Sequence, residues 1–189
     1  MAIRYKHSDI YSTYTYFCTF TCYNWLHLFE ITNSYDLVYN WFSILKNKYN
    51  SEIMAYVIMP NHIHCILYFK EAGFDLNKII SNGKRFMAYE IIRRLKQKGE
   101  TTLLQLLSES VTEREKKKGQ LHKIFKDSFD AKAIFSDKFL RQKIDYIHYN
   151  PVRGKWLLVS NYTDYEHSSA AFYELNAPKH SIPLHYRDV

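Results

Sequence analysis

The sequence has 189 residues, which is enough for one well-buried domain and short for two full domains. Hydrophobic residues make up 47% and charged residues 24%, and the presence of only 5 Gly and 4 Pro excludes a collagen-like or low-complexity chain. The net charge of +7 and the 17% of aromatic residues favour a surface for single-stranded nucleic acid, because cations contact phosphates and rings stack on bases.

Targeting signals and disulfides are not expected. The longest apolar runs, such as residues 55–59, are far shorter than the ~20 residues that a membrane span needs. The first residues lack the apolar stretch of a secretory signal. Cys18, Cys22 and Cys65 are odd in number and form no CxxC pair, which favours reduced thiols buried in strands. We therefore expect a cytoplasmic protein that does not enter a membrane.

The first part of the chain predicts strands around one helix. Residues 14–22 alternate Thr with aromatic and other β-favouring side chains, which predicts a strand. A helix follows, capped by Asn33 or Ser34, because apolar residues recur there with a period of 3.6: Leu37, Val38, Trp41, Ile44 and Leu45. Residues 53–59 and 62–69 are separated by Pro60-Asn61, which predicts two antiparallel strands joined by a tight turn.

A long helix is predicted next, over residues 75–98. Its buried stripe consists of Leu76, Ile79, Ile80, Met87, Ile91 and Leu95. The same segment carries many Lys and Arg residues, which suit a solvated helix face and a phosphate-binding surface about equally. Residues 103–111 are again helical by spacing, residues 113–119 form an exposed connector, and residues 121–135 are expected to be strand and turn.

A last helix is predicted from Ser136, its cap, to Asn150, because Pro151 excludes helical geometry from the residue before it. Residues 161–189 are Tyr-rich and are expected to form a C-terminal tail that packs on or extends from a domain of residues 1–160. The element order β-α-β-β-α-(α)-β-α predicts an α+β fold with helices on one face of an antiparallel sheet.

The first candidate for chemistry is the pair His62 and His64. Residues two apart on a strand point to the same face, so both imidazoles are available to one divalent metal ion. A His-x-His pair is also common on an ordinary polar strand face. The pair alone therefore leaves both interpretations open.

The helix that ends at Pro151 supplies the second candidate. Tyr146 and Asn150 are four residues apart and lie together on one flank of its apolar stripe, whereas Tyr149 is expected to face solvent. If that flank faces the histidine strand, two nitrogens and an amide oxygen surround a metal ion, and a phenol nucleophile stands beside it. Otherwise Tyr146 is a tyrosine at the edge of the core and Asn150 an ordinary helix-terminal residue.

Three segments resemble the HUH single-strand nucleases. Met59-Pro-Asn-His-Ile-His64 is similar to their two-histidine signature. Tyr146-Ile-His-Tyr-Asn-Pro-Val-Arg153 resembles the tyrosine motif of the single-tyrosine HUH transposases, especially the REP-associated tyrosine transposases. Asp164-Tyr-Glu-His-Ser-Ser-Ala170 matches a further stretch of that family. Order and spacing agree over roughly residues 14–173.

The resemblance implies a ferredoxin-like HUH endonuclease fold, with Mg²⁺ or Mn²⁺ as the cofactor. It implies that His62, His64 and Asn150 are the metal ligands and that Tyr146 is the nucleophile. The implied activity is cleavage and rejoining of single-stranded, hairpin-forming DNA through a 5′-phosphotyrosine, in transposition or the mobilisation of a repeat element. A bacterial, nucleoid-associated protein that acts as a monomer or a homodimer is expected.

Contacts to DNA outside the metal site are expected from cationic side chains. Lys84 and Arg85 lie in the middle helix, and Lys143 and Arg153 flank the tyrosine motif, although solvated charge explains these residues as well. Two other functions remain open. One is a domesticated protein that binds DNA hairpins without turnover, and the other is a phosphodiesterase that uses water and forms no covalent intermediate.

Overall fold

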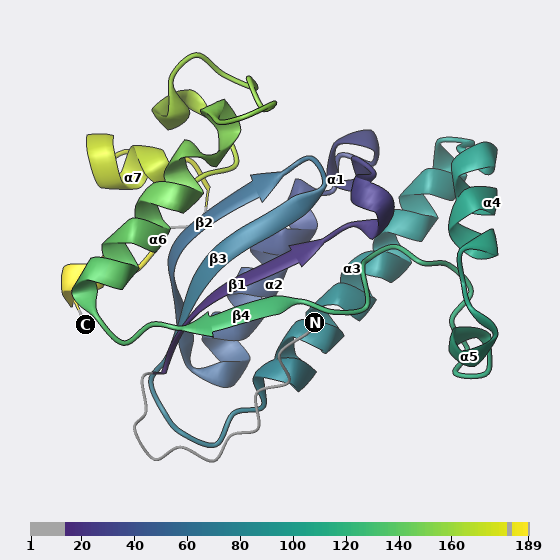
Figure 1. The fold of residues 1–189 in the computed structure, drawn as a ribbon, viewed down its shortest axis with the longest axis horizontal. Coiled ribbons are helices and arrows are strands. Elements are labelled where there is room, and N and C mark those ends of the chain that lie inside the picture. Colours follow the sequence, from purple (N-terminus) through teal and green to yellow (C-terminus); the bar gives the residue numbers. More distant parts are fainter. Residues whose placement is uncertain (1–13, 181–182, 189) are drawn as a thin grey trace.

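The computed structural model describes residues 14–180 and 183–188, and a four-stranded antiparallel sheet lies at its centre (Figure 1). The strands lie in the order β2-β3-β1-β4. Their bounds are β1 (Thr15–Thr21), β2 (Ser51–Met59), β3 (His62–Phe69) and β4 (Asp130–Ala133). The β2–β3 hairpin turns at Pro60-Asn61, as the sequence predicts. β4 is shorter than the predicted strand and turn of residues 121–135, and residue 125 forms only an isolated bridge to residue 22.

Two helices connect the strands in the ferredoxin-like manner. α2 (Tyr35–Tyr49) joins β1 to β2, and α3 (Leu76–Gln97) begins the connection from β3 to β4. Each connection crosses over a strand, so β1 and β3 occupy the centre of the sheet and β2 and β4 its edges. The expected α+β fold with a ferredoxin-like antiparallel sheet is confirmed.

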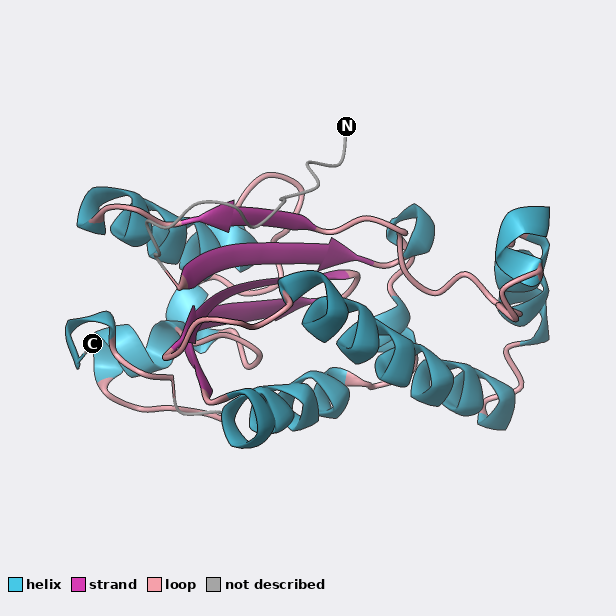
Figure 2. Ribbon diagram, turned by 90° about the horizontal axis from the view of Figure 1, so that it is seen from below, coloured by secondary structure: helices cyan, strands magenta, loops and turns pink. Residues whose placement is uncertain are grey.

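Helices cover both faces of the sheet, so the expectation of helices on one face was wrong (Figure 2). α2 and α3 pack on the face that carries Phe20 and Leu67. α6 (Asp137–Tyr149) packs on the opposite face, against Phe17 and Ile66. The physical reason is that the central strands have apolar side chains on both faces, and each apolar face must be covered. The core between the sheet and α2 and α3 is therefore separate from the core between the sheet and α6.

The remaining elements are short. They are α1 (Leu28–Ile31), α4 (Thr101–Glu109), α5 (Glu113–Lys116) and α7 (Ala170–Leu175), with 3-10 turns at Tyr23–Trp25, Asn150–Val152, Tyr162–Asp164 and Tyr186–Asp188. The expected connector at residues 113–119 thus contains a helical turn, which a capping box between Thr112 and Glu115 stabilises. Ile44 was predicted to lie in the buried stripe of α2 but is 49% exposed, because the buried face of that helix includes Phe42 in place of Ile44.

The C-terminal segment packs on the outer edge of the sheet. The main chain of residues 167–169 bonds to β2: Ile58 N donates to the His167 carbonyl at 2.8 Å, and Ser169 N donates to the Tyr56 carbonyl at 3.0 Å. Tyr165 is buried, and its hydroxyl donates to the Ile58 carbonyl. Figure 1 shows α7 beside α6. This segment covers a strand edge that would otherwise be open to another chain. Residues 181, 182 and 189 of the expected tail lie outside the described residues.

Two further expectations concern the described residues. Cys18, Cys22 and Cys65 are buried free thiols, as predicted. None of the described helices combines the length and the apolar character that crossing a membrane requires.

Candidate metal centre and nucleophile

His62 and His64 lie at the end of β3 next to the hairpin, on the face that α6 covers. Both side chains are buried, with 4% and 5% of their surface exposed. Their ring centroids are 4.8 Å apart. The strand alternation that the sequence predicts thus brings two imidazoles into contact on one buried face.

Asn61 determines which nitrogen of His62 carries the proton. The Asn61 amide nitrogen donates to the Trp25 carbonyl at 2.8 Å, so the amide oxygen must be the atom that faces His62. That oxygen lies 2.7 Å from His62 Nδ1 and can only accept, so Nδ1 is the protonated nitrogen. His62 Nε2 therefore carries a free lone pair, which is the state that a metal ligand needs.

The neighbouring strand β1 orients His64. Thr19 pairs with His64 across the strands, and the Thr19 hydroxyl lies 2.6 Å from His64 Nδ1. Phe17, two residues earlier on the same face, stacks on the His64 ring at 5.5 Å between centroids. A hydrogen bond at Nδ1 and a stacked ring together restrict the rotation of the imidazole. Both histidines are thus held through Nδ1.

Both imidazoles are neutral near pH 7. Burial lowers the pKa of His62 to about 4; the Asn150 side chain opposes this shift and the charge of Lys155 adds to it. Burial lowers the pKa of His64 well below its ordinary value, and the charges of His62 and Lys143 lower it further. Neutral imidazole is the form that binds metals, so no proton has to leave before coordination.

Tyr146 on α6 lies against this pair. Its ring centroid is 5.1 Å from that of His64, in an edge-on arrangement, and 5.9 Å from that of Phe17. The Tyr146 side chain is 40% exposed, so a ligand in solution can reach it. Lys143, one turn earlier, places its ammonium 5.4 Å from the centre of the Tyr146 ring. An exposed phenol beside two buried imidazoles and a cation is suited to attack on an anionic substrate.

Asn150 ends α6 on the same side. It is 9% exposed, and its side chain lies close enough to His62 to raise the pKa of that imidazole. Its Oδ1 atom is buried and accepts no hydrogen bond. An unpaired buried carbonyl oxygen costs about 1–3 kcal/mol, so a ligand that the oxygen could bind would remove this cost. The site therefore offers two nitrogen donors and one oxygen donor.

This donor set fits a divalent cation. No cluster of three or more His, Cys, Asp or Glu residues suited to a metal ion is present among the residues that the structure describes. The oxygen donor beside the two imidazoles is the Asn150 amide. Two imidazoles and one neutral oxygen leave open positions and full positive charge on the ion. Of the sequence-predicted site residues, His62, His64, Asn150 and Tyr146 are thus brought together.

Tyr149 and His148 point elsewhere. Tyr149, expected to face solvent, is half-buried against Tyr162, with 4.2 Å between ring centroids. The hydrogen bond that Tyr162 shares with Tyr149 favours the protonated phenol and raises the pKa of Tyr162 to about 12. His148 is buried on the other side of α6, where its Nε2 lies 2.9 Å from Ser169 Oγ. Neither residue reaches the histidine pair, because the helix turns them away from the flank that carries Tyr146.

The four predicted DNA contacts have different surroundings. Lys84 donates to the carbonyls of residues 126–128, the shortest at 2.5 Å, and burial lowers its pKa to about 8, so this ammonium is engaged by the protein's own main chain. Arg85 is exposed on α3. Lys143 lies at the site, over the rings of Phe17 and Tyr146. Arg153 is exposed and lies over the ring of Tyr149.

Sequence reasoning missed the residues that support the histidines. Thr19 and Asn61 hold the Nδ1 atoms, and Trp25 contacts the His62 ring edge-on at 5.7 Å between centroids. The sequence indicates Asn61 as part of the turn and gives no sign of its hydrogen bond to His62. Thr19 could not be chosen among the alternating threonines without the strand register, which pairs it with His64.

Comparison with known proteins gives one informative result. No protein-family model and no curated protein sequence matches the chain. Among solved structures, the chain is similar to a REP-associated tyrosine transposase bound to a REP hairpin. The TM-score is 0.60 and the identity 21%, over 96% of this chain and 93% of that chain. At this identity the likeness establishes a shared fold over nearly the whole length.

Proposed function

We propose that this protein cleaves and rejoins single-stranded, hairpin-forming DNA, with Tyr146 as the nucleophile and Mg²⁺ or Mn²⁺ at His62, His64 and Asn150. The observation that carries the proposal is the unpaired, buried Asn150 Oδ1 beside two neutral imidazoles, with an exposed phenol 5.1 Å from one of them. The fold shared with a hairpin-bound transposase supports the same function. Transposition or mobilisation of a repeat element is the process we propose for it.

The protein residues have separate tasks in this reaction. Tyr146 attacks the phosphorus, so the bond from its phenol oxygen to phosphorus forms and the bond to the 3′ oxygen breaks. The phenol loses its proton, and the leaving 3′ oxygen gains one. Lys143 places a positive charge beside the attacking ring. When bound, the cation would neutralise the scissile phosphate and stabilise the charge that develops during the reaction.

The product explains how strands could be rejoined. The 5′-phosphotyrosine retains a phosphodiester-like linkage, and attack by another 3′ hydroxyl reverses the step without ATP. Each site has one nucleophile, because Tyr149 is packed against Tyr162 and does not face the histidines. Full strand exchange then requires sequential events or a second subunit. We propose a homodimer as one way to supply the second tyrosine.

A denaturing gel tests the proposal. Labelled hairpin DNA is incubated with the protein and Mn²⁺, and we expect a covalent adduct that is lost in Tyr146→Phe and retained in Tyr149→Phe. Cleavage without an adduct would instead show a water-dependent phosphodiesterase. Tight binding with no covalent adduct and no cleaved DNA would show a binding protein without turnover. An adduct that survives in Tyr146→Phe and disappears in Tyr149→Phe would contradict the assignment of the nucleophile.

A further inference from the structure

Trp25 is a large exposed ring next to the metal site. It lies in the 3-10 turn after β1, its ring meets the ring of His62 edge-on at 5.7 Å, and 49% of its side chain is exposed. The other described tryptophans are more buried: Trp41 is in the core, and Trp156 is half-buried. Exposure of an indole to water is unfavourable, so this position suggests a ligand that covers the ring.

The main chain at Trp25 is held in an unfavourable conformation. Asn24 and Trp25 both have positive φ, at 49° and 58°, which bulky residues rarely adopt. The conformation is held by Asn61, whose amide nitrogen donates to the Trp25 carbonyl while its oxygen accepts from His62. One buried side chain therefore positions both the exposed indole and a candidate metal ligand. Strain of this kind persists only where the surroundings impose it, and it gathers at ligand sites.

Trp25 also connects the metal site to a groove. The Lys126 ammonium lies 4.3 Å from the centre of the Trp25 ring. Lys126 in turn lines a groove of about 840 Å³ between α3 and the segment that runs from α5 toward β4. A ligand that enters along this groove meets Trp25 before it reaches His62.

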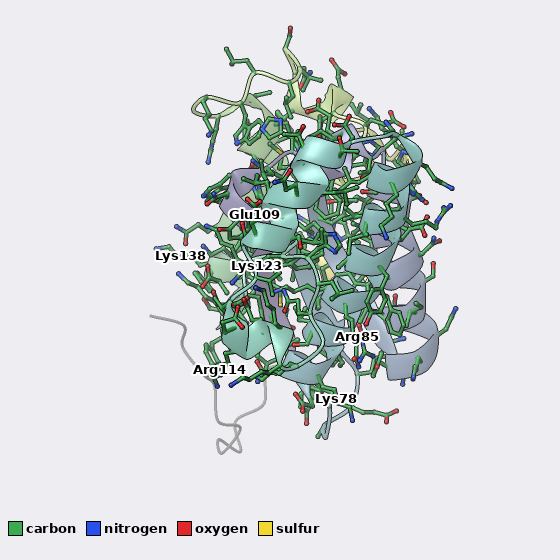
Figure 3. All side chains as sticks on the ribbon, turned by 90° about the vertical axis from the view of Figure 1, so that its right-hand side faces the viewer. Lys78, Arg85, Glu109, Arg114, Lys123 and Lys138 are labelled. Carbon is green, nitrogen blue, oxygen red and sulfur yellow. The ribbon has the colours of Figure 1, made fainter. Side chains whose placement is uncertain are left out.

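The groove has a cationic lining. Several of its side chains form no ion pair with an acidic residue in the described part of the chain: Arg85, Lys96, Arg114, Lys118 and Lys126. Its two acidic residues, Glu115 and Asp127, are both bound to Lys123. Figure 3 looks onto this side of the molecule and shows Arg85 on α3 and Arg114 on α5. A polyanion such as a phosphate backbone is the chemistry that this lining attracts.

We propose that Trp25 is a stacking platform for one base of a single DNA strand, adjacent to the phosphate held at His62 and His64, with Lys126 and the groove binding the backbone beyond it. This inference rests on the proposed function for the position of the phosphate. Lys126 now covers the indole and would move to a phosphate when a base replaces it. Base stacking on an aromatic ring tolerates any sequence, so the platform contributes affinity without selecting a base.

Binding of two matched probes tests the platform. One probe is a fluorescein-labelled dT 12-mer, and the other is a 12-mer of abasic nucleotides with the same phosphates. Affinities are measured by anisotropy in EDTA, so that neither cleavage nor metal binding contributes. We expect Trp25→Ala to weaken binding of the dT probe roughly ten-fold and to leave the abasic probe unchanged, because only the first can stack. Trp25→Phe should retain most of the affinity, and Lys126→Gln should weaken both probes.

The controls separate stacking from folding. Leu175→Ala removes another exposed apolar side chain, on α7, and should bind both probes like the wild type. Thermal unfolding checks that Trp25→Ala is folded. If Trp25→Ala weakened binding of both probes equally, or of neither, the proposal that Trp25 stacks on a base would be wrong. The adduct gel is independent of these measurements: absence of an adduct with an intact base preference would overturn the proposed reaction and leave the stacking site standing.

Discussion

At the scale of single residues, the candidate site is defined by hydrogen bonds to the histidines' Nδ1 atoms. Asn61 makes Nδ1 the protonated nitrogen of His62, so His62 Nε2 is available for coordination, and Thr19 holds Nδ1 of His64. Among the described residues, two buried side-chain oxygens have no hydrogen-bond partner, Ser51 Oγ and Asn150 Oδ1, and of these Asn150 lies beside His62. The missing hydrogen bond at Asn150 Oδ1 lowers the stability of the folded protein and leaves this oxygen available to a ligand.

Replacing Asn150 by Leu should raise stability and weaken metal binding. In EDTA we expect the free energy of unfolding of Asn150→Leu to exceed that of the wild type by about 1 kcal/mol, because a buried unpaired oxygen is removed. Mn²⁺ should stabilise the wild type and leave the variant unchanged. Urea unfolding with and without Mn²⁺ measures both effects. Lower stability of the variant in EDTA would show that the amide is satisfied within the protein.

At the scale of elements, the site depends on a sheet packed between two helical layers. α2 and α3 approach closely at Gly83, where a Cβ atom would lie 2.5 Å from Trp41 Nε1. This contact holds α3 on the sheet beside the groove. On the other face, α6 carries Tyr146, and the 165–171 segment covers the edge of β2 next to it. The position of Tyr146 thus follows from packing on both faces.

Gly83→Ala should destabilise the fold. Although alanine favours a helix by about 1 kcal/mol over glycine, the added methyl forces the Trp41 ring to move, and overpacking of this kind costs about 1–3 kcal/mol. We expect a net decrease in the free energy of unfolding, measured in urea. Ser81→Ala, at an exposed position of the same helix, is the matched control and should be neutral or slightly stabilising. A fully stable Gly83→Ala would mean that the two helices separate without cost.

The contact of the C-terminal segment should weaken in acid through His167. This imidazole stacks on Tyr35 at 3.7 Å, and burial together with the charge of His180 lowers its pKa to about 4. Below pH 6.5 the unfolded chain takes up a proton that the folded protein binds only near pH 4, so stability is lost as the pH falls through this range. His167→Phe should lose less stability than the wild type between pH 7 and 4.5. Urea titrations of both proteins at these pH values measure the difference. Equal losses of stability in the wild type and in His167→Phe would contradict the role of His167.

At the scale of the whole molecule, the cationic groove lies next to the candidate site. The net charge of +7 is not uniform. Cations that form no ion pair among the described residues line the groove between α3 and the segment from α5 toward β4, and Trp25 lies between that groove and the histidines. Under the proposed function, a polyanion attracted by the groove would approach the candidate site past Trp25.

Salt should weaken DNA binding in proportion to the groove's contacts. The slope of log affinity against log salt changes by about 0.7 for each phosphate contact on a single strand. We expect Arg114→Gln and Lys126→Gln each to reduce the slope by about this amount. Lys138→Gln, a cationic residue at the start of α6 and away from the groove, is the comparison and should leave the slope unchanged. Equal slopes for all three variants would place the phosphate path elsewhere.

Local patterns in the sequence predict the order of the main elements and the side of each that carries the candidate site residues. Alternation along residues 62–69 placed both histidines on one face, and helical phase placed Tyr146 beside Asn150, because these periods are local properties of the chain. Local patterns also misled in places: Tyr149 was expected in solvent, and helices were expected on one face only. Both errors arise because burial depends on neighbours distant in sequence, here Tyr162 and α6.

Three features of the site emerge only from the folded molecule. The tyrosine flank of α6 faces the histidines, Thr19 and Asn61 hold their Nδ1 atoms, and Lys84 is bound to main-chain carbonyls. Each of these contacts joins segments separated along the chain, or depends on the orientation that such contacts impose. Strand register and helix docking are set by the packing of the whole core, and a one-residue shift of either would separate the phenol from the imidazoles.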